Sequence, residues 1–326
     1  MSVVRNEHPS GSEEGEAEYH TSGPINRVVW CSTQRIDMMR TRVCGTDYLP
    51  THLPTWNGCC HDGGCGEGLA MGWHVIVAAN PGVGKSMLAL NLAAGFTKKN
   101  ATVGFLSLEM SKGQLTNRWL SIRTGVPLRH IENDAGKYDP THYDAAYAEV
   151  LAAEEGALYV EDSRSLRHLD AALSLMRTWK DWHGVNVIIV DYMQLLTAGG
   201  GDLRAQTEEV SKSLADFAKD ENIVIVGLSQ FNRETSRNYE SSPQIQGLYG
   251  GMVMEGDADQ VVMIDHSKYE KDFNSAGILR GARTWVILGK NRHGPGGEIP
   301  VYIDYRTLRV TEALPDEEHR WPGVQK

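Results

Sequence analysis

The chain has 326 residues, a net charge of −10 and 41% hydrophobic residues. This length accommodates one large α/β domain, or at most two small ones, with an ample core. No stretch approaches the roughly 20 apolar residues of a membrane-spanning helix, and the first residues lack a secretory signal. The five cysteines, an odd number, favour a reducing cytoplasm. We therefore expect a cytoplasmic protein with no membrane partner.

Acidic residues gather at both ends of the chain. Residues 1–24 carry five glutamates against one arginine, and residues 312–326 carry four acids against two bases, which is −4 and −2 and leaves −4 for the body. A negative chain disfavours non-specific DNA binding, but most of the charge lies in the tails. Residues 1–24 have few large apolar groups, and we expect them to be disordered. Both tails are expected to keep the chain in solution, with partner docking as the alternative.

The rest of the chain is organised as one folded unit. Residues 25–44 are compatible with a short amphipathic linker helix, and residues 45–311 form the expected domain. Within it, apolar runs alternate with longer stretches of helical periodicity: HVIVAA, TVGFLSL, ALYVED, NVIIVDY, IVIVGLS, QVVMID and TWVILG. This alternation is typical of an α/β fold with a mostly parallel central sheet flanked by helices. Ligands of such sheets bind at the carboxyl ends of strands, so we expect functional residues directly after these runs.

A phosphate-binding loop follows the first run. The expected nucleotide contacts are Asn80, Pro81, Gly82, Val83, Gly84, Lys85, Ser86 and Met87. Gly82 and Gly84 let the backbone turn its N–H groups toward phosphates at a helix N-terminus. Lys85, expected on an exposed loop, supplies charge to the β- and γ-phosphates, and the Ser86 hydroxyl is placed to ligate Mg²⁺. The first motif position is Ala79 rather than glycine, so the strand before and the helix after the loop support the assignment.

Three further runs end in polar residues. The run NVIIV ends in Asp191, the expected Walker B acid that holds the water shell of Mg²⁺. Glu109 follows TVGFLSL and could orient and deprotonate the attacking water, or could be an acid favoured by a helix dipole. Gln230 follows IVIVGLS and could sense the γ-phosphate, or could cap the strand end. Together with the phosphate-binding loop, these residues predict ATP and Mg²⁺ as ligands.

Six strings, in this order, resemble the C-terminal motor domain of DnaB-type replicative DNA helicases over roughly residues 45–310: ANPGVGKS, SLEMS, VDYMQLL, LSQFNRE, EGDADQVV and GKNRHGP. The string SLEMS is similar to this family rather than to recombinases. The resemblance implies a RecA-like P-loop ATPase that forms a ring, most simply a hexamer. It also implies 5′ to 3′ movement on single-stranded DNA and unwinding of forked duplex.

The family resemblance also assigns roles to individual residues. It makes Glu109 the catalytic base. Lys290 and Arg292 match a Lys-x-Arg pair that reaches the γ-phosphate bound by the neighbouring subunit, so Arg292 is the expected arginine finger, with a surface arginine as the alternative. Arg204, in a glycine-rich loop after Asp191, and Arg237, in a second loop, are the expected DNA contacts. A solvated arginine remains the alternative for Arg204.

Partners and setting follow from the same resemblance. We find no recognisable counterpart of the family's N-terminal helical domain or of a primase-like segment, so we expect a separate primase and leave the loader and polymerase open. The compact motor suits a virus or plasmid replication system in a bacterial cytoplasm or a phage-infected host. The rival interpretation is a RecA-fold ATPase of recombinase or switch type that binds DNA or protein without unwinding. A third is an assembly protein whose nucleotide is structural.

A cysteine-rich stretch raises the question of zinc. Cys59, Cys60 and Cys65 lie beside His61, but their spacing fits no standard pair of Cys-x-x-Cys knuckles. We therefore expect an irregular loop here, with zinc as the alternative.

Overall fold

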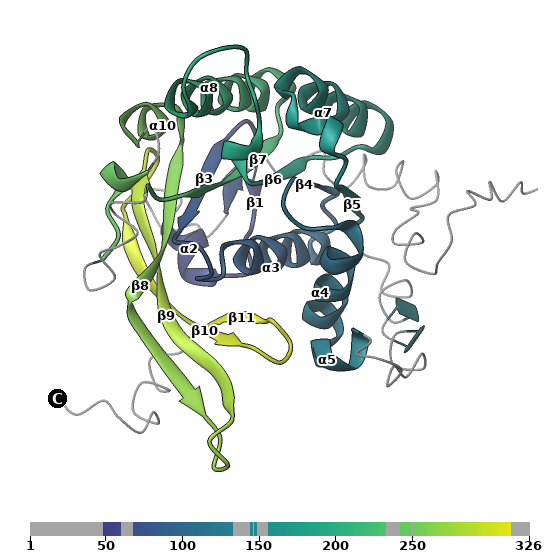
Figure 1. The fold of residues 1–326 in the computed structure, drawn as a ribbon, viewed down its shortest axis with the longest axis vertical. Coiled ribbons are helices and arrows are strands. Elements are labelled where there is room, and N and C mark those ends of the chain that lie inside the picture. The colour runs from purple at the N-terminus through teal and green to yellow at the C-terminus, as the bar shows by residue number, and fades with distance from the viewer. Residues whose placement is uncertain are drawn as a thin grey trace, which may run out of the picture.

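A nine-stranded sheet with helices on both faces forms the centre of the computed structural model (Figure 1). The structure describes residues 48–59, 68–132, 144–145, 147–148, 156–232, 242–248 and 251–313. The expected N-terminal tail, the expected linker helix, Arg237 and residues 314–326 of the expected C-terminal tail lie outside these ranges.

The sheet has the strand order β11-β10-β9-β8-β3-β7-β6-β4-β5. Its strands are β3 (His74–Ala79), β4 (Val103–Ser107), β5 (Leu158–Glu161), β6 (Val187–Asp191), β7 (Val224–Gln230), β8 (Gln260–Phe273), β9 (Leu279–Asn291), β10 (Gly297–Asp304) and β11 (Val310–Glu312). The six strands from β8 to β5 in this order pair in parallel, whereas β9, β10 and β11 pair antiparallel. The expected α/β fold with a mostly parallel sheet is confirmed, and an antiparallel extension of three strands is added at one edge.

Two layers of helices cover the sheet (Figure 1). One layer contains α2 (Pro54–Cys59), α3 (Lys85–Lys98), α4 (Lys112–Thr124) and α5 (Leu128–Ile131). The other contains α7 (Leu169–His183), α8 (Leu203–Glu221) and α10 (Gly251–Asp257). The remaining elements are short: β1 (Tyr48–Leu49) pairs with β2 (Leu69–Ala70), and the 3-10 turns are η2 (Arg164–Arg167), η3 (Met193–Leu195) and η4 (Ile245–Gly247).

Alternating side chains of the central strands divide the core into two apolar layers. In β3, Val75 and Val77 pack with the α3 side of the core, and Ile76 and Ala78 pack with the α7 and α8 side. All four are fully buried. Successive side chains of a strand point to opposite faces, so a strand covered on both faces is apolar throughout, as this one is.

The antiparallel extension begins with a long hairpin that sequence patterning missed. The run QVVMID predicts a short strand, but β8 continues to Phe273, and β9 returns from Leu279 to Asn291. In Figure 1 this hairpin projects beyond the helical layers. At the end of the sheet, β11 includes Glu312, whose carboxylate accepts a hydrogen bond from the Thr55 backbone N–H at 2.9 Å.

Candidate functional site

The loop between β3 and α3 has the backbone of a phosphate-binding loop. Gly82 and Gly84 have φ angles of 77° and 102°, in the left-handed region that glycine adopts without strain. Gly84 is the N-cap of α3 and offers no side chain to the first turn of the helix. The first N–H groups of a helix have no intrahelical acceptor, and the helix dipole favours an anion at this end.

Lys85 is buried, contrary to the expectation of an exposed loop position. It is the first residue of α3, and its side chain turns inward, with Nζ 4.3 Å from the centre of the Tyr192 ring. Its Nζ has no hydrogen-bond partner among the described residues. Burial lowers the pKa of Lys85, and the nearby charges of Asp191 and Glu109 oppose this shift. A buried ammonium group that lacks an acceptor fits a phosphate oxygen as its ligand.

Asp191 lies beside this lysine at the carboxyl end of β6. Its side chain is fully buried, and neither carboxylate oxygen has a hydrogen-bond partner of normal geometry within the described part of the chain. Burial raises the pKa of Asp191, while Lys85 and then the Ser86 hydroxyl act to lower it. A carboxylate with free oxygens beside a hydroxyl suits Mg²⁺, which takes oxygen ligands and keeps several of its waters.

The other two strand-end residues lie at the same edge of the sheet. The Leu108 N–H donates to the Asp191 carbonyl at 2.8 Å, which places Glu109, exposed, next to the buried pair. The charge of Glu109 helps to raise the pKa of Asp191. Gln230 is the register partner of Ala79, the residue before the phosphate-binding loop.

Sequence reasoning missed three neighbours of this site. The Lys85 ammonium group makes a cation–π contact with the Tyr192 ring. The charge of Arg118 acts to lower the pKa of Asp191. The Gln194 amide donates to the Ser229 hydroxyl at 2.7 Å and to the Gln230 carbonyl at 3.3 Å. Tyr192 and Gln194 lie within the string VDYMQLL, so the string contained this signal, whereas nothing in the sequence pattern singles out Arg118.

Lys290 and Arg292 follow the run TWVILG, as expected, but they lie at the opposite edge of the sheet from the phosphate-binding loop. Because β9 runs antiparallel to β8, its carboxyl end lies beside the amino ends of β8 and β3: Lys290 is in register with Val261, and the Arg292 N–H donates to the Asp259 carbonyl at 2.9 Å. The Asp259 N–H in turn donates to the carbonyl of His74, the first residue of β3, at 2.8 Å. Six strand residues, about 20 Å at 3.3 Å each, separate this end of β3 from the phosphate-binding loop.

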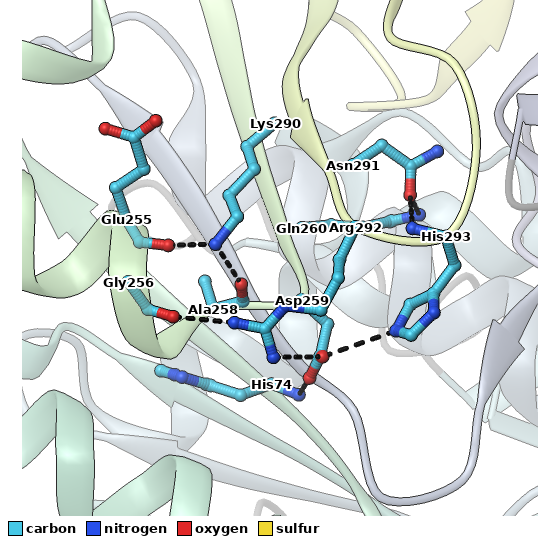
Figure 2. Close-up of polar contacts among 10 residues, drawn as sticks. All are labelled: His74, Glu255, Gly256, Ala258, Asp259, Gln260, Lys290, Asn291, Arg292 and His293. Atoms are coloured by element: carbon cyan, nitrogen blue, oxygen red, sulfur yellow. Dashed lines mark hydrogen bonds and ion pairs between the residues drawn. The ribbon is translucent and has the colours of Figure 1, made fainter.

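The two cations are held by a cluster of acceptors (Figure 2). The Arg292 guanidinium donates to the Asp259 carboxylate at 3.2 Å and to the Gly256 carbonyl at 2.7 Å. The Lys290 ammonium donates to the Ala258 carbonyl at 2.8 Å and also to the carbonyl of Glu255. Burial lowers the pKa of Lys290, and the neighbouring Arg292 charge adds to the shift.

Of the two expected DNA contacts, the structure describes one. Arg204 lies in the first turn of α8, is exposed, and pairs with Glu208 at 2.8 Å. Glu208 raises the pKa of Arg204 through this hydrogen bond. Helix α8 begins after the carboxyl end of β6, so Arg204 lies toward the nucleotide-site edge of the sheet.

The cysteine-rich stretch lies almost wholly outside the residues that the structure describes. Cys60, His61 and Cys65 lie outside the described residues. Within the described ranges, no group of three or more His, Cys, Asp or Glu side chains is placed to hold a metal ion. No helix in the same ranges is long and apolar enough to cross a membrane.

Comparison with known protein families identifies one domain in the chain. The model of the DnaB-like helicase C terminal domain matches residues 64–312. The replicative DNA helicase DnaB of Leifsonia xyli subsp. xyli is 32% identical over 253 residues, which cover 76% of this chain and 54% of that protein. The chain thus spans about half the length of the curated relatives it matches.

Solved structures show the same fold. A structure of an isolated ATPase domain superposes with a TM-score of 0.66 at 20% identity, covering 86% of this chain and 98% of that one. A DnaB-like replicative helicase, solved for its interactions with primase, also gives 0.66, at 18% identity, covering 87% and 67%. The α/β core of this chain therefore shares its fold with both.

Proposed function

This chain belongs to the DnaB-like helicase C terminal domain family, and on that premise we propose that it is the ATP-hydrolysing motor of a ring-forming replicative DNA helicase. The motor translocates 5′ to 3′ on single-stranded DNA and unwinds forked duplex. The observation that carries the proposal is the separation of the phosphate-binding loop and the Lys290–Arg292 pair to opposite edges of one sheet.

Each subunit binds ATP in the loop from Asn80 to Met87. The Lys85 ammonium meets the β- and γ-phosphates, which supply the acceptor that its Nζ lacks among the described residues. Ser86, and Asp191 through water, would hold Mg²⁺, which would supply positive charge to the phosphates. Glu109 orients the attacking water and accepts its proton. Gln230, at the end of the strand next to β3, hydrogen-bonds the γ-phosphate and senses its loss.

A neighbouring subunit completes the site. Lys290 and Arg292 lie about 20 Å of strand length away from the loop of their own subunit, too far to reach its phosphates. A head-to-tail arrangement brings the Lys290–Arg292 pair of one subunit to the phosphate-binding loop of the next. Repetition of this contact closes a ring if the rotation between subunits allows it. We propose a hexamer. Arg292 then stabilises charge on the transferred phosphoryl group.

DNA lies in the central channel of this ring. Arg204, exposed near the nucleotide edge, contacts the phosphate backbone, and we assign Arg237 to the same role. The exposed Arg204–Glu208 pair is weak, so a phosphate can replace the glutamate. The motor acts in a bacterial cytoplasm or phage-infected host together with a separate primase, a loader and a polymerase. A DnaB-like structural relative is solved for its interactions with primase, which supports the first of these partners.

Strand displacement tests this function. With ATP and Mg²⁺, the protein is expected to displace a strand from a forked DNA with a 5′ single-stranded tail, and to act poorly on a blunt duplex. A ring needs a free strand to encircle, and the excluded strand needs an exit. DNA binding should weaken as salt is raised, because phosphate contacts release counterions. A protein that hydrolyses ATP and binds single strands but separates no fork at low salt, or that forms open filaments instead of closed rings in electron micrographs, belongs to the non-unwinding class.

A further inference from the structure

Asp259 is a buried carboxylate at the amino end of β8, and its partners leave it little freedom. Only 4% of the residue is exposed. One carboxylate oxygen accepts the His74 backbone N–H at 3.0 Å, and the other faces the Arg292 guanidinium at 3.2 Å and the His293 ring at 3.4 Å. Its backbone is bonded to His74 on one side and to Arg292 on the other. The carboxylate is therefore a fixed point at the edge of the sheet, next to the proposed finger (Figure 2).

The C-terminal end of α10 provides a second fixed point. The Gly256 carbonyl accepts from Arg292, and the Ala258 and Glu255 carbonyls accept from Lys290. Carbonyls at the end of a helix lack intrahelical donors and carry the negative end of its dipole, so they bind cations well. One helix end thus holds both members of the pair.

These contacts leave part of the guanidinium available. A guanidinium has five N–H donors, and the Asp259 and Gly256 contacts occupy two of them. The Arg292 side chain is 41% exposed, so it lies at the surface of the subunit. Arg292 can therefore contact a phosphate bound by an adjacent subunit while it keeps its hydrogen bonds to Asp259 and Gly256.

We propose that Asp259 is a positioning residue for ATP hydrolysis: it fixes the Arg292 guanidinium, in advance, in the orientation in which it meets the γ-phosphate of the neighbour. This inference rests on the proposed function, because it needs Arg292 to act across an interface. Asp259 itself touches no nucleotide. Its contribution is to remove the rotamer freedom of a long, half-exposed side chain before the phosphate arrives, which preorganises the site.

Replacement of Asp259 by asparagine tests this role, because the amide keeps the shape and can still accept from His74 while it loses the charge that holds Arg292. In the full chain, D259N is expected to lower the kcat for ATP about tenfold, the scale of one charge-assisted contact, with KM unchanged. D304N is the matched control, because Asp304 also faces an arginine, Arg306 at 3.5 Å, and accepts its backbone N–H, but lies away from the finger. It should keep normal turnover. D259E, which retains the charge, should keep more of the kcat than D259N and replaces it as the test if D259N fails to fold.

Two further measurements separate positioning from a structural role. D259N should cause no additional loss in the R292A background, because it acts only through Arg292. Rings mixed from D259N and K85A subunits should regain turnover, because the K85A subunit supplies an intact finger to the intact loop of its neighbour. Normal turnover of D259N, additive losses with R292A, or no recovery in demonstrably mixed rings would each overturn the inference. Normal turnover of R292A itself would overturn both the inference and the proposed finger, whereas an impaired R292A with a normal D259N would overturn the inference alone.

Discussion

At the scale of single residues, the nucleotide site is marked by buried charges that lack ordinary partners. Lys85 and Asp191 are both buried and without hydrogen bonds of normal geometry among the described residues. Such groups cost free energy of folding, and strongly perturbed charges of this kind cluster at functional sites. Phosphate and magnesium would supply the partners.

Removal of the Lys85 charge separates its effect on ATP turnover from its effect on stability. K85A is expected to lower ATP turnover by at least about a hundredfold, because a charge aimed at the transferred phosphoryl group is lost. The unfolding midpoint should be unchanged or higher, because the variant no longer buries an ammonium group that lacks an acceptor. Steady-state ATPase and urea unfolding measure the two effects. Turnover like that of the wild type would show that the site is assigned wrongly.

A buried histidine links stability to pH. Burial lowers the pKa of His74 to about 4 from its usual 6.5, and neither ring nitrogen has a hydrogen-bond partner within the described part of the chain. Between these two values the unfolded chain binds a proton that the folded protein excludes, so stability falls as the pH decreases from 6.5 toward 4. At pH 5 this single residue should cost about 2 kcal/mol relative to pH 7.

Urea unfolding at pH 7 and pH 5 measures that loss. H74Q should reduce the pH dependence. An H74Q protein that loses as much stability as the wild type would place the effect on other groups.

At the scale of elements, the sequence predicts the parallel core well, because its strands are buried on both faces and read as continuous apolar runs. It predicts Lys85, Asp191 and Gln230 at one edge for the same reason: parallel strands bring their carboxyl ends together. It does not indicate which edge of the sheet the pair at the end of β9 occupies, because strand direction is set by pairing, which an apolar run does not record. The contact of Asp259 with Arg292 is missed for the same reason, since it depends on the register between β8 and β9.

One close helix–sheet contact gives a stability prediction. A Cβ added at Gly104, in β4, would lie 2.5 Å from the Trp179 ring of α7. Strand β4 and the Trp179 side chain are both buried in the core. G104A should therefore destabilise the fold by about 1–3 kcal/mol through overpacking. G200A, where nothing lies within 4 Å, is the matched control and should change stability by less than about 0.5 kcal/mol. An equal effect of the two substitutions in urea unfolding would show that the packing of α7 on β4 is looser than described.

At the scale of the whole molecule, the two halves of the proposed catalytic site lie at opposite ends of the sheet within each subunit. The phosphate-binding loop lies at one end of β3, and the finger pair lies beside the other end. A rigid sheet holds the halves apart, so no rearrangement of side chains joins them within one chain. If both halves act in catalysis, as we propose, a second copy of the chain has to supply the Lys290–Arg292 pair, and this is the basis of the proposed ring.

Subunit mixing tests this central claim most directly. E109Q alone should bind ATP but not hydrolyse it, because the amide keeps the shape of the base without its basic oxygen, and R292A alone should lack the finger. In a ring mixed from equal amounts of the two, about a quarter of the interfaces join an intact Glu109 to an intact Arg292, so ATPase should recover to about a quarter of the wild-type rate if the sites act independently. Recovery at this level is the result that the account predicts. No recovery, in rings shown to contain both variants, would place Arg292 within its own subunit's site or outside catalysis and would contradict it.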